Sequence, residues 1–155
     1  MTDRKTKDAA QVYRAICSVL DEKKRTYEKN KKELSVCFQK KCDDIEASFE
    51  MRVDTERQLV TLTATLPFCM SEEKRAEGVL ATCKASCGMT IGHFNYDATD
   101  GSLSFRITES FVDCTIDQGV YDEMIICASA MIAEYGGKFL ALDKGTADLS
   151  VFDEL

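Results

Sequence analysis

The segment from Met89 to Thr108 reads MTIGHFNYDATDGSLSFRIT, and it carries the clearest structural signal in the chain. Two segments with alternating apolar residues flank a polar loop at residues 97–101. Phe94 and Tyr96 fall on one side of the first segment, and one side of the second segment carries Leu103, Phe105 and Ile107. Asp100-Gly101 closes the loop with a glycine, which readily adopts the positive φ that a tight turn requires. The pattern predicts a β-hairpin.

Length and composition predict one domain that spans residues 1–155. A chain of 155 residues is long enough to bury a sizeable core, and 45% hydrophobic with 30% charged residues is typical of a globular protein. No apolar run of membrane-spanning length stands out. Residues 1–10 are charged and lack the apolar centre of a secretory signal. We therefore expect a cytoplasmic protein without a membrane segment, in which residues 1–7 are frayed.

Charge is unevenly distributed along the chain. Residues 1–41 hold 12 Lys/Arg against 6 Asp/Glu, a net charge of +6, whereas residues 42–155 hold 8 against 21, a net charge of −13. The basic part, residues 23–41, could contact nucleic acid or an acidic partner. No aromatic stacking platform accompanies it, and glutamates interrupt it. A solvated surface is the favoured interpretation, and a nucleic-acid partner is not expected.

Eight cysteines raise the questions of disulfides and metal binding. Most lie in apolar periodic segments, and a reducing compartment favours unpaired thiols that pack as small core residues. Cys83 and Cys87 share a helical face, but the chain has no Cys-x-x-Cys pair and a single histidine, His93. We expect eight unpaired thiols, no metal and no other cofactor.

Apolar periodicity predicts the order α-β-β-β-α-β-β-α. A helix is expected from Asp8 to about Lys24, followed by strands near residues 34–39, 47–53 and 60–66, the last ended by Pro67. Ser71 is expected to cap a second helix that ends before Gly88. Its expected inner stripe is Ala76, Val79, Leu80, Cys83 and Cys87.

The last third of the chain predicts a third helix and an acidic tail. Thr115 or Asp117 could cap the helix, and its expected core stripe is Val120, Met124, Ile125 (or Tyr121), Ala128, Met131, Ile132 and Tyr135. Gly136-Gly137 could end the helix, but the apolar phase continues to about Ala141, which favours a kinked continuation. Residues 145–155 form the tail. The predicted fold class is α+β, a five-stranded antiparallel sheet with helices on one face.

The segment from Leu66 to Gly145 contains four short motifs: Leu66-Pro67-Phe68, Glu72–Arg75, Gly92–Asp97 and Asp100–Arg106. In these motifs and in the order of its elements, the segment resembles the YbjN family of bacterial proteins. This resemblance implies a fold similar to class I type III secretion chaperones, which are non-enzymatic, usually dimeric and bind extended segments of partner proteins. Relatives of YbjN are described as sensory or regulatory proteins, although a shared fold does not transfer that role.

Two classes of function follow, and a catalytic constellation is not among the motifs. The favoured class is a dimeric protein-binding or chaperone-like module of unknown client; its expected dimer or partner surface is Met89, Ile91, Phe94 and Tyr96. The alternative is a regulator that binds a small ligand or nucleic acid, in which His93 and Arg106 would contact the ligand. For Arg106 a buried ion pair is the simpler interpretation, and His93 is expected on the more open face of the sheet. Asp97 and Asp100 are expected to form Asx turns rather than a calcium loop.

Overall fold

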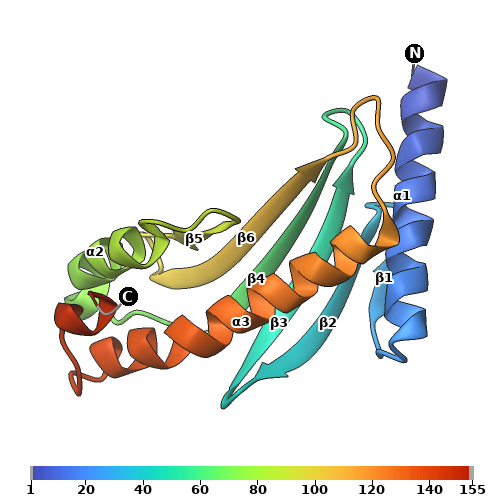
Figure 1. Ribbon diagram of the computed structural model, residues 1–155. Coiled ribbons are helices and arrows are strands. Elements are labelled where there is room, and N and C mark those ends of the chain that lie inside the picture. The colour runs from blue at the N-terminus through green and yellow to red at the C-terminus, as the bar shows by residue number, and fades with distance from the viewer. Residues whose placement is uncertain (1, 154–155) are drawn as a thin grey trace.

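A computed structural model describes residues 2–153 of the chain (Figure 1). Three α-helices, two short 3-10 helices and six strands follow one another in the order α1 (Thr2–Glu22), β1 (Glu28–Asn30), β2 (Ser35–Cys42), β3 (Ile45–Asp54), β4 (Leu59–Cys69), η1 (Glu72–Lys74), α2 (Arg75–Ser86), β5 (His93–Tyr96), β6 (Ser102–Ser110), α3 (Gln118–Asp143) and η2 (Leu149–Phe152).

The strands form one open antiparallel sheet in the order β1-β2-β3-β4-β6-β5. The α+β class and the antiparallel arrangement are as predicted, but the sheet has six strands and not five. The additional strand, β1, is three residues long and exposed throughout, and it pairs with the start of β2. Strand β1 buries no side chain and is held by backbone pairing with β2. Its Glu-Lys-Asn sequence therefore lacks the apolar alternation by which the other strands were predicted.

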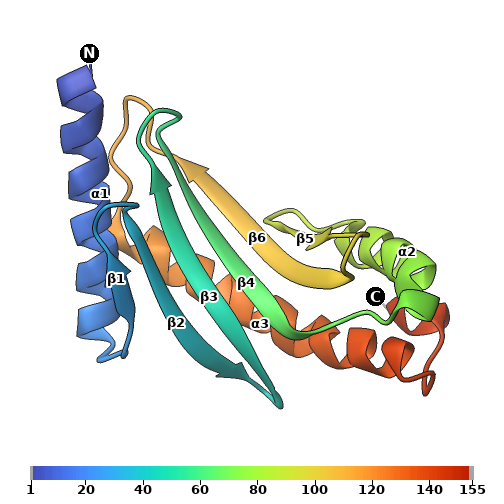
Figure 2. The same ribbon diagram turned by 180° about the vertical axis from the view of Figure 1, so that it is seen from behind.

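The sheet has one apolar and one polar face, as period-2 alternation dictates. Residues such as Phe49, Leu62 and Phe105 point into the core and are at most 1% exposed. Threonine, serine and charged residues alternate with them on the other face. All three helices leave this polar face uncovered, as the view from behind shows (Figure 2).

Helix α3 lies across the apolar face, and α1 packs at the end of the sheet that carries β1 and β2 (Figure 1). Helix α1 begins at Thr2, so residues 2–7 are helical where fraying was expected; Met1 lies outside the described residues. An ion pair between Lys7 and Asp3, one helical turn apart with the atoms at 2.9 Å, accompanies this first turn. The buried residues of α1 include Val12, Ile16 and Leu20, which recur at the helical spacing on which the prediction of this helix rested.

Helix α3 is continuous through Gly136-Gly137, as the apolar phase indicated, and Asp117 caps it by accepting a hydrogen bond from the Gly119 N–H at 2.8 Å. Gly136 is buried against the side chain of Ile45, whose Cδ1 atom would have to shift to make room for a Cβ atom. In length and apolar composition α3 is the one helix in residues 2–153 that could cross a membrane. The sequence prediction did not anticipate this, but the inner side of α3 packs into the core of the sheet.

The end of β4 and the tail differ from expectation. Strand β4 continues past Pro67 to Cys69, because its pairing with β6 is irregular between Thr65 and Cys69 and no ladder hydrogen bond is required of the proline there. Part of the acidic tail folds as η2, and Phe152 packs between Tyr135 and Phe139 of α3. The last two residues of the predicted tail, 154–155, lie outside the described part of the chain.

Candidate functional site

The hairpin of β5 and β6 forms one end of the sheet and carries most of the predicted site residues. Its turn is built as predicted: Gly101 has φ +77°, and the Asp97 carbonyl accepts its N–H at 2.8 Å. The Asp97 carboxylate accepts hydrogen bonds from the hydroxyl and the N–H of Thr99, and these bonds lower the pKa of Asp97. Asp100 accepts the Ser102 N–H. Both aspartates therefore stabilise the turn as Asx residues.

Helix α2 packs closely against β5 through small residues. Its buried residues are Gly78, Ala81, Thr82 and Ala85. A Cβ atom at Gly78 would lie 2.9 Å from the Tyr96 ring, and the Tyr96 hydroxyl donates a hydrogen bond to the Arg75 carbonyl at 3.0 Å. Residues 78, 81 or 82, and 85 recur at helical spacing, so a stripe of small residues was the sequence signal for this close approach, and it was missed.

The stripe predicted to face the core is the outer face of α2, and this prediction was wrong. Ala76, Val79, Leu80, Cys83 and Cys87 are all exposed, with Val79 at 41% and Leu80 at 54%. We call these five residues the α2 outer face. The helix has apolar or small residues on both sides. It lies so close to the Tyr96 ring that only the side with the smaller residues can pack there.

Exposed apolar side chains concentrate at this end of the molecule. Ile91, in the loop between α2 and β5, is 56% exposed, and Met89 in the same loop is half-buried. Three of the five large exposed hydrophobic residues in the described chain lie on or just after α2; the other two, Val112 and Ile126, lie elsewhere. Strand β5 is also the last strand of the sheet, so one of its edges is unpaired.

The other two predicted surface residues are occupied within the protomer. Phe94 is 4% exposed and makes edge-to-face contacts with Phe105, Tyr135 and Phe139, with ring centroids 5.2–5.6 Å apart. It belongs to the core that joins β5 to α3, so placing it on the surface was wrong. Tyr96 is half-buried under α2, and this burial raises its pKa.

His93 and Arg106 lie together on the polar face of the sheet. They are directly opposite each other in the β5–β6 register, and both side chains are exposed. The position of His93 is as predicted. The buried ion pair expected for Arg106 was wrong, because no carboxylate lies within ion-pair distance of it in residues 2–153 and its side chain extends into solvent.

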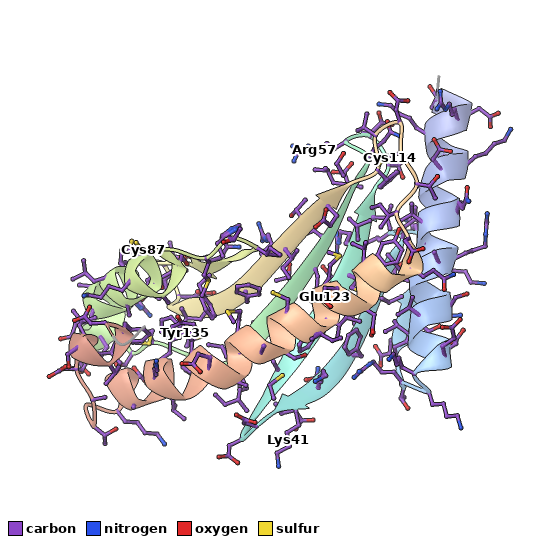
Figure 3. All side chains as sticks on the ribbon, in the orientation of Figure 1. Lys41, Arg57, Cys87, Cys114, Glu123 and Tyr135 are labelled. Carbon is purple, nitrogen blue, oxygen red and sulfur yellow. The ribbon has the colours of Figure 1, made fainter. Side chains whose placement is uncertain are left out.

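The thiols are more accessible than predicted. All eight cysteines are unpaired, but Cys37, Cys69, Cys83, Cys87 and Cys114 are exposed and only Cys17 and Cys42 are buried. Burial raises the pKa of Cys42. Cys87 lies at the end of α2 on the side turned away from α3 (Figure 3). Within residues 2–153 there is no cluster of three or more potential metal-ligating side chains.

Comparison with known proteins supports the fold of this chain. No protein-family model matches the sequence, and no curated protein matches it, so the resemblance to YbjN stays a prediction. Among solved structures, a chain in the crystal structure of the ExsC–ExsE complex is similar: the TM-score is 0.54 with 10% sequence identity, and the match covers 81% of this chain and 92% of that one. This chain therefore shares its α+β fold with a chain of that complex, in line with the type III secretion chaperone-like fold that the sequence predicted.

Proposed function

We propose that this protein is a non-enzymatic, dimeric, protein-binding module of the chaperone or regulatory type, and that it acts in the cytoplasm. One observation carries the proposal: the α2 outer face and Ile91 expose apolar side chains beside the unpaired edge of β5. The similarity to a chain from a complex of two proteins supports a protein partner in general.

A second copy of the chain fits the exposed end for physical reasons. Burial of grouped apolar side chains stabilises an interface by about 25 cal/mol for each Å² of apolar surface removed from water. The outer edge of β5 offers backbone donors and acceptors to another chain, apart from the Phe94 N–H, which the Ser86 hydroxyl already accepts. Residues Met89 and Ile91 lie between these two features in the sequence and are part of the proposed interface.

Light scattering with matched variants tests the dimer. The wild type should have twice the 17.3 kDa mass of the chain at micromolar concentration. Leu80→Glu and Ile91→Glu should lower the mass to that of one chain while the circular dichroism spectrum is unchanged. Val112→Glu is the matched control, because Val112 is 49% exposed but lies in the loop before α3. A wild-type mass of one chain across the concentration range, or an equal effect of all three variants, would refute the proposed dimer.

Protein binding is tested separately by affinity purification of the tagged wild type from cells that express it. Partners are quantified by mass spectrometry against Leu80→Glu and Val112→Glu. A partner that remains with Val112→Glu and is then reconstituted from purified components supports the proposal; recovery of only the bait contradicts it.

The alternative, a regulator that binds a small ligand, is favoured by one observation. His93 and Arg106 lie opposite each other on an uncovered face. Nucleic acid is less favoured, because the basic residues 23–41 remain interleaved with glutamates in the folded chain, and Glu33 pairs with Arg52 at 3.3 Å.

A further inference from the structure

The polar face of the sheet carries a group of hydrogen-bond donors at its β5–β6 end. His93 is opposite Arg106 in the register, and Asn95 is opposite Ser104. Directly opposite residues have Cβ atoms about 5 Å apart, and residues two apart on one strand are about 7 Å apart. The four side chains therefore mark the corners of a small rectangle on the polar face of the sheet.

The backbone fixes this rectangle firmly. Gly92, which precedes His93, has φ +74°, and a Cβ atom there would lie 2.8 Å from the Arg106 carbonyl oxygen. Only a glycine permits the loop before β5 to lie this close to β6. The Ser86 hydroxyl accepts the Phe94 N–H at 3.0 Å, which ties the same strand to α2.

The donors at these corners lack acceptors within the described chain. The Asn95 Nδ2 atom is buried and has no hydrogen-bond partner. Asn95, Ser104 and Arg106 line one open hollow, bounded by Tyr96–Ala98 and Ser102. The Asn95 Nδ2 atom has almost no solvent-accessible surface, so the Asn95 side chain must turn toward the hollow before an acceptor from outside can complete its hydrogen bonding.

Nearby carboxylates are already engaged elsewhere. Asp97 and Asp100 accept hydrogen bonds inside the turn. On the polar face, Glu50 lies opposite Thr63, which lies opposite Arg106, and the Glu50 carboxylate pairs with Arg52 at 3.2 Å. The four side chains have no acid directly opposite them in the register, and the one acidic residue that lines the hollow, Asp97, is hydrogen-bonded to Thr99.

We propose that His93, Asn95, Ser104 and Arg106 form a binding site for a single oxyanion, either a carboxylate or a phosphate group. Arginine recognises both with paired N–H donors, and the amide and hydroxyl complete the set. The site lies on the uncovered sheet face and uses none of the α2 outer face. It can therefore succeed or fail independently of the proposed dimer.

An NMR titration tests the site with inorganic phosphate and with acetate, at constant pH and ionic strength. The chain has one histidine, so the ring signals of His93 are assigned without ambiguity. At least one of the two anions should shift them along a saturable curve. Arg106→Gln should weaken that binding about tenfold, the loss expected for one charge-assisted pair, and Asn95→Ala should weaken it by less.

Arg14→Gln is the matched control, because Arg14 is an exposed arginine on α1 and forms no ion pair in the described chain. Its titration curve should equal that of the wild type. Saturation by phosphate alone assigns the site to phosphate, and saturation by acetate alone assigns it to carboxylate. Shifts that rise linearly with both anions, or an equal loss in Arg14→Gln and Arg106→Gln, would overturn the proposal. Unchanged amide spectra confirm that each variant is folded.

Discussion

Helices α1 and α2 carry the same kind of apolar periodicity and use it in opposite ways. The stripe of α1 is buried, with Ile16 at 1% and Leu20 at 0% exposure, whereas the α2 outer face points to solvent, with Leu80 at 54%. Periodicity shows which residues share a side of a helix. It does not show whether that side meets the core of the same chain or is left for another.

The difference comes from what each helix has on its other side. The side of α1 opposite its apolar stripe is charged or polar, as at Gln11 and Arg14, so only one orientation buries apolar surface. The other side of α2 is lined by Gly78, Ala81 and Ala85, which pack closely on β5 and α3. A helix with two sides that can pack against apolar surface buries one in its own chain and leaves the other exposed.

The largest expected effect is the loss of a buried leucine from α1. Leu20→Ala should lower the free energy of unfolding by about 2–5 kcal/mol, because it removes a fully buried side chain and leaves a cavity. Leu80→Ala on α2 should change the stability of the protomer by less than about 0.5 kcal/mol. Denaturant unfolding measures both.

Protein concentration makes this test sharper. If α2 forms a dimer interface, the small cost of Leu80→Ala should grow with protein concentration, while the cost of Leu20→Ala should not. Equal costs for the two variants at every concentration would mean that both stripes are core and that the comparison is false.

The inner side of α2 provides the next test. Gly78→Val should lower the free energy of unfolding by about 1–3 kcal/mol, because the new side chain overlaps the Tyr96 ring, which its hydrogen bond to Arg75 holds in place. Leu80→Val is the control on the outer side and should be nearly neutral. A stable Gly78→Val variant would show that α2 can move away from β5.

The sheet was predictable, because one of its faces is covered and the other is not. Because of this arrangement, apolar and polar residues alternate in the sequences of β2, β3, β4 and β6. It also fixes the register of the hairpin, in which Phe94 lies opposite Phe105 on the covered face. Strand β1 was not predictable, because it buries no side chain. For the N-terminal cap of α3, the sequence pattern left two candidates, Thr115 and Asp117, and the structure shows that Asp117 is the cap.

The candidate site was less predictable than the fold. Placing Ile91 and Met89 near a surface was consistent with the structure, but Phe94 is one residue from His93 and points the other way, into the core. The environment of Arg106 depends on β4 and β5, the two strands that flank β6 in the sheet, and β4 is far from β6 along the chain. Pairing across strands determines such sites, and a single sequence does not encode it locally.

A pH series examines the end of the molecule where α1 meets the start of α3. Burial raises the pKa of Tyr121 to about 12 from an ordinary value of 10.0, and the nearby Cys114 adds to the shift. The unfolded chain then loses this proton at lower pH than the folded chain, so stability should fall as the pH rises from 10 to 12. Tyr121→Phe should make that fall shallower in denaturant unfolding. Other tyrosines, such as Tyr13, also have a raised pKa, so part of the fall should remain. An unchanged slope would contradict the burial of Tyr121.

The smallest effect is expected in α3, where buried and open positions are neighbours. A Cβ atom at Gly137 would meet nothing within 4 Å, whereas one at Gly136 would overlap the Ile45 side chain. Gly137→Ala should therefore raise the free energy of unfolding by about 0.5–1 kcal/mol, because alanine restricts the unfolded chain and favours the helix. Gly136→Ala should instead lower it by up to about 1 kcal/mol, because the Ile45 Cδ1 atom, at the end of a flexible side chain, must shift to make room. Thermal unfolding measures the stability change of each variant and so compares the inner and outer sides of one helix at adjacent positions. If both substitutions stabilised the protein, α3 would not pack on Ile45, and the contrast between a filled inner side and an open outer side would fail for this helix.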